Sequence, residues 1–465
     1  MKYILSPFIA LRSWDKVPFA YYVRNDIKAY PLTREEFLIL LNCDGKTELE
    51  KSKLLKSLID KKLVIPAKVN DSLSEWQKPQ VYFNRYMPRI NLEITSKCNY
   101  NCIHCFNAID NSPILSEMSY ENVLTLLDEA KEVGVCAFTI TGGEPMVHKN
   151  FMDIIRAIYE RDMCVFELNT NGYFINEAKL NYFNLIGCNP LIKISFDGLD
   201  YHDWMRGRKG AEGITLNAIK LCIEKGFSVK IQYNINKKNL STLYETLDLL
   251  DSMGVEEIRL ICTTPAPRWE KNAAGQTLDL KEYFDLSLEI AKNYISKEHH
   301  ATLNIWQVLT IFPNEKMYAL SPVKSTETKY RETIPICSDA RSMMAIGATG
   351  NVYPCMQMSG YFDEHNIFLG NVFKDGLSKL LDKSKYMSYI CQDVKDRINN
   401  NDKCGKCKYL EYCAGGCPAL GLLYSKRGNI LDPDPSKCLF YEFGYYEKMT
   451  EIFTDWHNLT IMDNV

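Results

Sequence analysis

The chain has 465 residues, of which 46% are hydrophobic and 24% charged, and its formal net charge at pH 7 is −3. This composition is typical of a soluble globular protein, and the length predicts roughly two to four domains. The near-neutral charge and the lack of an uncharged apolar run of about 18 residues argue against nucleic acid or a membrane as a partner. The stretch Met1–Lys16 lacks a basic segment followed by a cleavage site, so we expect no signal peptide.

Cysteine is the unusual component, because the chain has 17 of them. A chain of this length builds a core without disulfides, so we interpret the cysteines as reduced, partly metal-binding thiols of a cytoplasmic protein. Ten of them fall into groups. The others stand singly, mostly in apolar segments, and are interpreted as small buried hydrophobic residues: Cys43, Cys136, Cys164, Cys188, Cys222, Cys262 and Cys391.

Residues 1–80 predict a small α/β domain. Asn25–Asp26 separates two strand-like segments, as a hairpin turn does. Thr33 and Glu36 have the spacing of a capping box at the start of a helix, and a second amphipathic helix and a returning strand follow. This order describes a winged-helix-like domain, with a plain capping domain as the alternative.

Residues 81–310 alternate between strands and helices. Ser119 has the character of an N-cap, and amphipathic segments recur through residues 151–161, 174–185, 213–225, 240–253 and 281–295. About six βα units imply a parallel sheet that closes partly into a (β/α)6 barrel, in which chemistry gathers at the carboxyl ends of the strands. The predicted strands are Ile90–Thr95, Cys136–Thr141, Cys164–Asn169, Leu191–Phe196, Val229–Asn234 and Glu257–Cys262.

Residues 311–465 do not show this alternation of strands and helices, and they carry seven of the grouped cysteines. A region with little regular structure and spaced cysteines is usually built around metal. We therefore expect a cysteine-rich C-terminal domain.

Three cysteines follow the first predicted barrel strand in the spacing CxxxCxxC: Cys98, Cys102 and Cys105. Three thiolates on one loop can hold three corners of a cubane iron–sulfur cluster and leave the fourth iron open. Zinc is the alternative, but zinc sites usually take four ligands from paired CxxC groups, and no fourth ligand is evident here. His104 lies beside Cys105 and is interpreted as shielding the cluster.

This motif resembles that of the radical S-adenosylmethionine (SAM) superfamily, CxxxCx-aromatic-C, with His104 in the aromatic position. The resemblance implies a 4Fe–4S cluster whose open iron binds the amino and carboxylate groups of SAM. Reductive cleavage would give methionine and a 5′-deoxyadenosyl radical that abstracts hydrogen from the substrate. The resemblance also implies a flavodoxin- or ferredoxin-type electron donor.

Further segments at the ends of successive predicted strands fit SAM binding in this superfamily. Residues Gly142–Pro145 form a GGEP segment at the end of the second predicted strand. Its glycines let the backbone approach a ligand, and its glutamate can accept a hydrogen bond from the methionine ammonium. Arg208 competes with Arg206 for the methionine carboxylate, and Gln232 is a candidate for the ribose. The predicted SAM-contacting residues are His104, Gly142, Gly143, Glu144, Pro145, Asn171, Ser195, Asp197, Arg206 and Gln232.

The later cysteines resemble the SPASM extension of radical enzymes that modify peptides, with its pattern CxnGxxxxC, CxxCxxxxxCxxxC and a final C. The resemblance implies two auxiliary 4Fe–4S clusters, three clusters in all. One would be held by Cys404, Cys407, Cys413 and Cys438, and the other by Cys337, Cys355 and Cys417.

The second of these clusters lacks a predicted fourth ligand. Some relatives have an eighth cysteine just before the first, where this chain has Ile334–Ile336. The cluster is then expected to have an open iron able to bind a substrate thiolate, unless Cys391 fills the position. Two structural zinc sites are the alternative.

A winged-helix unit before a SPASM-type radical enzyme resembles the ribosomal-peptide maturases, in which the leader of a precursor peptide adds as a strand to the wing. The stretch Ser195–Gly210 resembles sactisynthases of Gram-positive bacteria, which join a Cys sulfur to a carbon. Thioether formation on a precursor peptide is therefore the leading expectation.

Four alternatives remain open. Carbon–carbon or carbon–oxygen crosslinking and epimerisation would use the same radical chemistry. Relatives that mature sulfatases have an Asp directly after the cysteine that matches Cys355, and this chain has Met356 there. A zinc-rich nucleic-acid binder predicts a basic surface, which the near-neutral charge disfavours.

Overall fold

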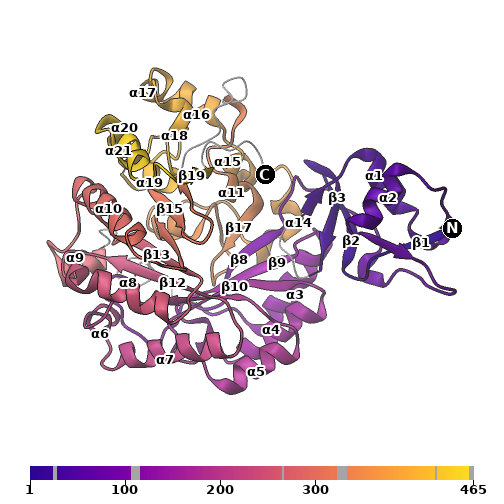
Figure 1. Ribbon diagram of the computed structural model, residues 1–465, viewed down its shortest axis with the longest axis horizontal. Helices are drawn as coiled ribbons and strands as arrows, with labels where there is room; N and C mark the ends of the chain where they lie inside the picture. The colour runs from indigo at the N-terminus through magenta and orange to yellow at the C-terminus, as the bar shows by residue number, and fades with distance from the viewer. Residues whose placement is uncertain (25–28, 106–115, 264–266, 322–331, 425–426, 460–465) are drawn as a thin grey trace.

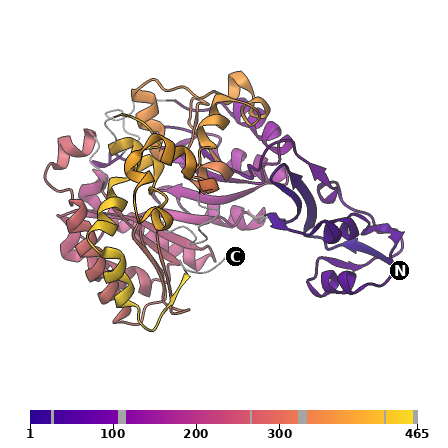
Figure 2. The same cartoon turned by 90° about the horizontal axis from the view of Figure 1, so that it is seen from above.

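The computed structural model describes residues 1–24, 29–105, 116–263, 267–321, 332–424 and 427–459. A small N-terminal unit lies at one side of a larger body (Figures 1 and 2). The larger body contains one long sheet, and strands from the C-terminal region form both of its edges. Within the described ranges, no helix is both long and apolar enough to cross a membrane.

The N-terminal unit consists of two small sheets and two helices. One sheet has the order β5-β1-β6 and the other β4-β3-β2-β7. The strands are β1 (Lys2–Leu5), β2 (Ile9–Trp14), β3 (Val17–Val23), β4 (Ala29–Pro31), β5 (Asp44–Glu48), β6 (Val64–Pro66) and β7 (Gln80–Val81), and the helices are α1 (Arg34–Leu41) and α2 (Lys53–Asp60).

The local predictions for this unit hold, but the winged-helix assignment is not confirmed. β3 and β4 pair antiparallel as a hairpin, whose turn lies outside the described residues. Thr33 and Glu36 form the capping box, with Glu36 N donating to Thr33 Oγ1 at 3.1 Å and Thr33 N to Glu36 Oε2 at 2.9 Å. The unit distributes its strands over two sheets.

All six predicted barrel strands are confirmed, and they lie side by side in chain order and parallel. A seventh parallel strand, β14 (Thr302–Ile305), continues the sheet. The six are β8 (Arg89–Glu93), β9 (Ala137–Thr141), β10 (Cys164–Thr170), β11 (Leu191–Ser195), β12 (Val229–Ile235) and β13 (Glu257–Cys262). The connecting helices are α3 (Tyr120–Glu132), α4 (Phe151–Glu160), α5 (Glu177–Leu185), α6 (His202–Arg206), α7 (Ala211–Glu224), α8 (Leu243–Ser252), α9 (Pro267–Ala273) and α10 (Leu280–Ile295).

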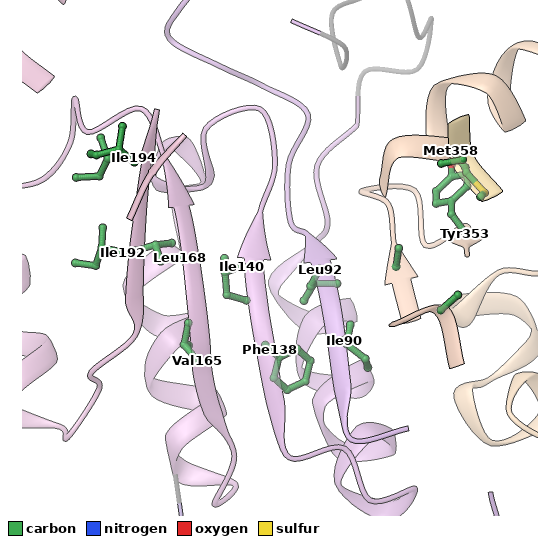
Figure 3. Packing of buried hydrophobic residues seen from close by; sticks show 14 of the residues in the cluster. Ile90, Leu92, Phe138, Ile140, Val165, Leu168, Ile192, Ile194, Tyr353 and Met358 are labelled. Atoms are coloured by element: carbon green, nitrogen blue, oxygen red, sulfur yellow. The ribbon is translucent and has the colours of Figure 1, made fainter. Parts of the chain in front are cut away.

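Apolar and polar residues alternate along the strands, so that apolar side chains point toward the helices and polar side chains point to the inner face of the sheet. Ile90, Leu92, Phe138 and Ile140 are 0% exposed, and Figure 3 shows these side chains beside the helices. Burying each such side chain stabilises the fold by roughly 1.5–3 kcal/mol. Polar residues alternate with them and occupy the other face, which is where a barrel of this kind takes its ligands.

C-terminal strands extend the sheet at both edges. At one edge β17 (Met343–Ile346) pairs parallel with β8, and β18 (Val352–Tyr353) pairs with β17. At the other edge β15 (Leu309–Phe312), β16 (Met317–Leu320) and β19 (His457–Asn458) follow β14. The sheet therefore runs across position 310, where the sequence places a domain boundary.

Short helices make up most of the rest of the C-terminal region. They are α11 (Ser338–Ser342), α12 (Ser359–Glu364), α13 (Val372–Asp375), α14 (Leu377–Leu380), α15 (Lys385–Ile390), α16 (Val394–Asn400), α17 (Asp402–Gly405), α18 (Leu410–Cys413), α19 (Pro418–Tyr424), α20 (Pro435–Glu442) and α21 (Tyr445–Ile452). The mixed α/β fold with a large parallel sheet and a cysteine-rich C-terminal region agrees with the sequence-based expectation.

Candidate active site

The loop with the first three cysteines leaves the carboxyl end of β8 and is held by α6 and the residues after it. Ile103 N donates to Met205 O at 3.0 Å, and Arg208 Nη1 donates to Asn99 O at 3.2 Å. Gly207 has φ +60°, and a Cβ there would lie 2.5 Å from Asn101 O, so only glycine permits this approach. Arg208, the competing candidate for the methionine carboxylate, is therefore engaged with the cysteine loop.

Side-chain N–H groups point at two of the three sulfurs. Arg206 Nη1 lies 3.8 Å from Cys102 Sγ, and Asn171 Nδ2 lies 3.9 Å from Cys98 Sγ. Donors of this kind stabilise thiolate sulfur in metal sites. Burial raises the pKa of the Cys98 thiol to about 11, so this thiol keeps its proton until a metal displaces it.

The two glycines of the GGEP segment pack against the backbone that leads into this loop. A Cβ at Gly142 would lie 2.3 Å from Thr95 O, and one at Gly143 would lie 2.4 Å from Lys97 O. Gly143 N donates to Thr95 O at 2.8 Å, and Glu144 N donates to Lys97 O at 2.9 Å. The glycines thus let the ends of β8 and β9 approach each other.

The Glu144 carboxylate is fully buried and links the ends of β9 and β10. It accepts from Thr170 Oγ1 at 2.9 Å, from Asn171 N at 2.8 Å and from Met146 N at 3.2 Å. Burial raises its pKa to about 7. Pro145 opens the short 3-10 helix that Glu144 caps. These donors fix the position of the carboxylate, and its expected contact with the methionine ammonium stays a prediction.

A buried charged group lies beneath the loop. Arg206 Nη2 lies 2.7 Å from Asp197 Oδ2, and both side chains are almost fully buried. His104 Nε2 lies 3.3 Å from Asn234 Nδ2, and Asn234 N donates to Asp197 Oδ1 at 3.0 Å. Burial lowers the pKa of His104 to about 4, so the imidazole is neutral at pH 7.

Ser195 and Gln232 are neighbours in register on β11 and β12, on the inner face of the sheet. Sequence reasoning missed Asn234, which lies two residues beyond Gln232 and therefore on the same face, nearer the carboxyl end. It also missed Thr170, the partner of Glu144. The strand period could have identified Asn234, whereas nothing in the sequence indicates which way the Glu144 side chain turns.

The later cysteines lie in two groups, which have the same members as the two ligand sets that the SPASM resemblance implies. A single cavity is lined by four thiols from α17, α18 and α20 and the loop between: Cys404, Cys407, Cys413 and Cys438. The second group is Cys337, Cys355 and Cys417, whose thiols interact electrostatically with one another. Burial raises the pKa of Cys355 to about 12 and that of Cys417 to about 11.

The residues present fit iron–sulfur clusters. Four thiols around one cavity are the ligand set of a cubane cluster, and three thiols on one loop with N–H donors at their sulfurs match a cluster with an open corner. Within the described ranges, no three Cys, His, Asp or Glu side chains converge closely enough to hold a single metal ion.

Comparisons with known proteins agree with this site. The radical SAM superfamily matches residues 92–250, and the iron–sulfur cluster-binding SPASM domain matches residues 337–408. An AdoMet-dependent heme synthase of Methanosarcina barkeri is 23% identical over 75% of this chain and 95% of its own length. The antilisterial bacteriocin subtilosin biosynthesis protein AlbA of Bacillus subtilis is 25% identical over 73% of this chain and 69% of its own length.

A solved structure shares the overall fold. Streptococcus suis SuiB, in the crystal structure with its precursor peptide SuiA, superposes with a TM-score of 0.64 at 15% identity. The superposition covers 93% of this chain and 98% of SuiB. The chain therefore carries a radical SAM domain and a SPASM iron–sulfur cluster-binding domain.

Proposed function

We propose that this protein is a peptide maturase that joins a cysteine sulfur to a carbon of the same ribosomally made precursor peptide. The likeness to SuiB carries this proposal, because it spans nearly the whole chain. Only about 7% of the chain falls outside that superposition, so part of residues 1–81 must fall within it. The relative AlbA, a bacteriocin biosynthesis protein, supports the same substrate class.

In this proposal Cys98, Cys102 and Cys105 hold the cluster that binds SAM, and the bound pair supplies a hydrogen-abstracting 5′-deoxyadenosyl radical. Asn171 and Arg206 position the loop through their N–H groups. Ser195 and Gln232 offer polar groups on the inner face of the sheet, where the ribose of SAM would lie. The later cysteines hold two auxiliary clusters, three in all, and a flavodoxin- or ferredoxin-type protein supplies the electrons.

The balance of the reaction fixes its product. One C–H bond and one S–H bond of the peptide break and one C–S bond forms. The hydrogen atom leaves in 5′-deoxyadenosine, the thiol proton goes to solvent, and one electron passes to an auxiliary cluster.

The N-terminal unit would hold the leader of the peptide as an added strand, since its sheets end in short edge strands such as β4.

The test is a single incubation of the reconstituted chain with SAM, a reductant and the precursor peptide encoded beside its gene. We expect the peptide to lose about two hydrogen masses per crosslink and one alkylatable thiol per crosslink. A Cys102→Ala variant is the matched control. An unchanged mass would indicate epimerisation or no reaction. A mass loss with every thiol still alkylatable would indicate a carbon–carbon or carbon–oxygen bond.

The heme synthase relative favours a second candidate, an iron porphyrin substrate, because the match covers 95% of that protein. The two candidates differ in how much of this chain they account for, since the match to the heme synthase leaves a quarter of the chain uncovered and the superposition on SuiB leaves about 7%. A porphyrin titration followed by its visible absorbance is the deciding measurement. Saturable porphyrin binding together with an inert precursor peptide would replace the peptide proposal. Sulfatase maturation remains disfavoured by Met356.

A further inference from the structure

Two segments of the C-terminal region run antiparallel beside the cysteine group Cys337, Cys355 and Cys417. Pro335 and Asp393 form an antiparallel bridge, with Ile336 N donating to Gln392 O at 3.3 Å. In antiparallel pairing, one step forward on one segment is one step back on the other. The hydrogen bond from Ile336 N to Gln392 O lies one residue before Cys337 and one residue after Cys391, which is the C-cap of α15, so the backbones of the two cysteines are held close to each other.

An arginine fixes this juxtaposition. Arg341 lies in α11, the helix that begins directly after Cys337. Its Nη2 donates to Cys391 O at 2.9 Å and to Gln392 O at 2.8 Å. The helix after one cysteine is thus tied to the backbone of the other, which is the C-cap of α15 (Lys385–Ile390).

A second contact relates Cys391 to another member of the group. Tyr386, in α15, is 0% exposed. Its hydroxyl interacts electrostatically with the thiols of both Cys355 and Cys391. Cys391 is therefore tied to the segment of Cys337 through backbone contacts and shares the buried neighbour Tyr386 with Cys355.

We propose that Cys391 is the fourth protein ligand of the iron–sulfur cluster held by Cys337, Cys355 and Cys417. The chain has no cysteine between Cys262 and Cys337, where an eighth cysteine of the SPASM pattern would stand, and Cys391 is the one cysteine between Cys355 and Cys404. The inference rests on the proposed cluster at these three cysteines. It implies that every iron of this cluster has a protein ligand, so the cluster accepts an electron from the peptide without binding its thiolate.

The test uses full-length chain that carries Cys98→Ala, Cys102→Ala and Cys105→Ala, so that the SAM-binding cluster does not contribute. Carbon-13-labelled cyanide is added to the reduced protein, because cyanide binds an iron that lacks a protein ligand, and ENDOR spectroscopy reads its coupling to the cluster. We expect no coupling in this background. We expect coupling, with the loss of about one iron per chain, when Cys391→Ala is added. Cys222→Ala, a buried single cysteine in α7, is the matched control and should behave as the background.

Two results would overturn the inference. One is cyanide coupling already present in the background, and the other is a Cys391→Ala variant with unchanged iron and no coupling. A Cys337→Ala variant that keeps all of its iron would instead overturn the proposed cluster itself, so the two failures are distinguishable. If Cys391→Ala does not fold, alkylation of the unmutated chain decides: Cys391 should resist iodoacetamide in the iron-loaded protein and react after iron is chelated, and reaction in the loaded protein would refute its role as a ligand.

Discussion

Gly143→Ala should displace the cysteine loop and remove its cluster, because the new Cβ meets backbone atoms that cannot rotate away. It would lie 2.4 Å from Lys97 O and 2.6 Å from Ser96 O. Restoring a contact of 3.0 Å to Lys97 O requires a shift of about 0.6 Å in the chain that leads directly to Cys98. The same shift stretches the hydrogen bonds from Gly143 N to Thr95 O and from Glu144 N to Lys97 O.

The expected cost follows from these contacts. Overpacking at a closely packed site costs roughly 1–3 kcal/mol, and two weakened hydrogen bonds add about 1 kcal/mol. Alanine also lowers the backbone entropy of the unfolded chain, which offsets only about 0.4–1 kcal/mol of this loss of stability. We therefore expect a net loss on the order of 2 kcal/mol in the free energy of unfolding, measured by urea denaturation. With the three clusters proposed above, we also expect the loss of about four of about twelve irons after reconstitution.

Gly213→Ala is the matched control for this prediction. Gly213 lies in α7, and a Cβ there meets nothing within 4 Å. This variant should gain roughly 0.5–1 kcal/mol and keep all of its iron. A Gly143→Ala protein with unchanged stability and a full iron content would refute the reasoning, since the loop would then tolerate an approach that the structure forbids.

Three further substitutions test buried charge. Arg206→Met leaves the Asp197 carboxylate buried without its partner, so the free energy of unfolding should fall by about 3–5 kcal/mol in a urea titration. Arg397→Met removes the donor to three buried carbonyls of the C-terminal region, so we expect a loss of about 3 kcal/mol and a lower auxiliary iron content. Burial and the Asp363 carboxylate raise the pKa of Glu93 from 4.5 to about 7. This raised pKa stabilises the fold at low pH, and the stabilisation is lost as the pH rises through 7. Between pH 6 and pH 8 the unmutated chain should therefore lose on the order of 1 kcal/mol relative to Glu93→Gln.

Each of these has an outcome that contradicts it. Arg156→Met removes only exposed ion pairs and should leave the urea midpoint unchanged, so an equal effect for Arg206→Met would argue against a buried pair. Arg397→Lys should recover little, because a point charge cannot reach three carbonyls as a guanidinium does, and full recovery would refute the hydrogen-bond argument. Parallel pH profiles for Glu93→Gln and the unmutated chain would show that this carboxyl titrates normally.

The sequence predicted the barrel because its signals are local. Apolar residues alternate within each strand, and Ser119 Oγ accepts from Asn122 N as an N-cap should. The pairing of β17 with β8 could not be predicted, because it joins segments about 250 residues apart and β17 has only four residues. Nor does the winged-helix reading of residues 1–80 follow from local elements, since one order of strands and helices fits several arrangements.

For the candidate site, too, the sequence predicted the positions of residues along the chain but not the directions of their side chains. The SPASM resemblance, and not the spacing alone, divided the later cysteines into two groups, and the structure brings the members of each group near one another. The GGEP segment lies at the end of β9 as predicted. The sequence did not show that its glycines face Thr95 and Lys97 or that its carboxylate accepts from Thr170. A motif gives the position of a residue along the chain, whereas the direction of its side chain depends on neighbours from other strands.

The pairing of β17 with β8 has a consequence for electron transfer. β8 leads into the loop of Cys98, and β17 begins just after Cys337 and α11. Adjacent strands of one sheet keep a fixed spacing of about 4.8 Å, and a four-residue strand spans only about 13 Å. The two proposed cluster sites are therefore joined through a hydrogen-bonded ladder. A cluster that only passes electrons needs such a fixed separation, whereas one that binds a peptide thiolate needs room for a chain to enter. The short ladder and the ligand proposed at Cys391 both favour the first of these roles.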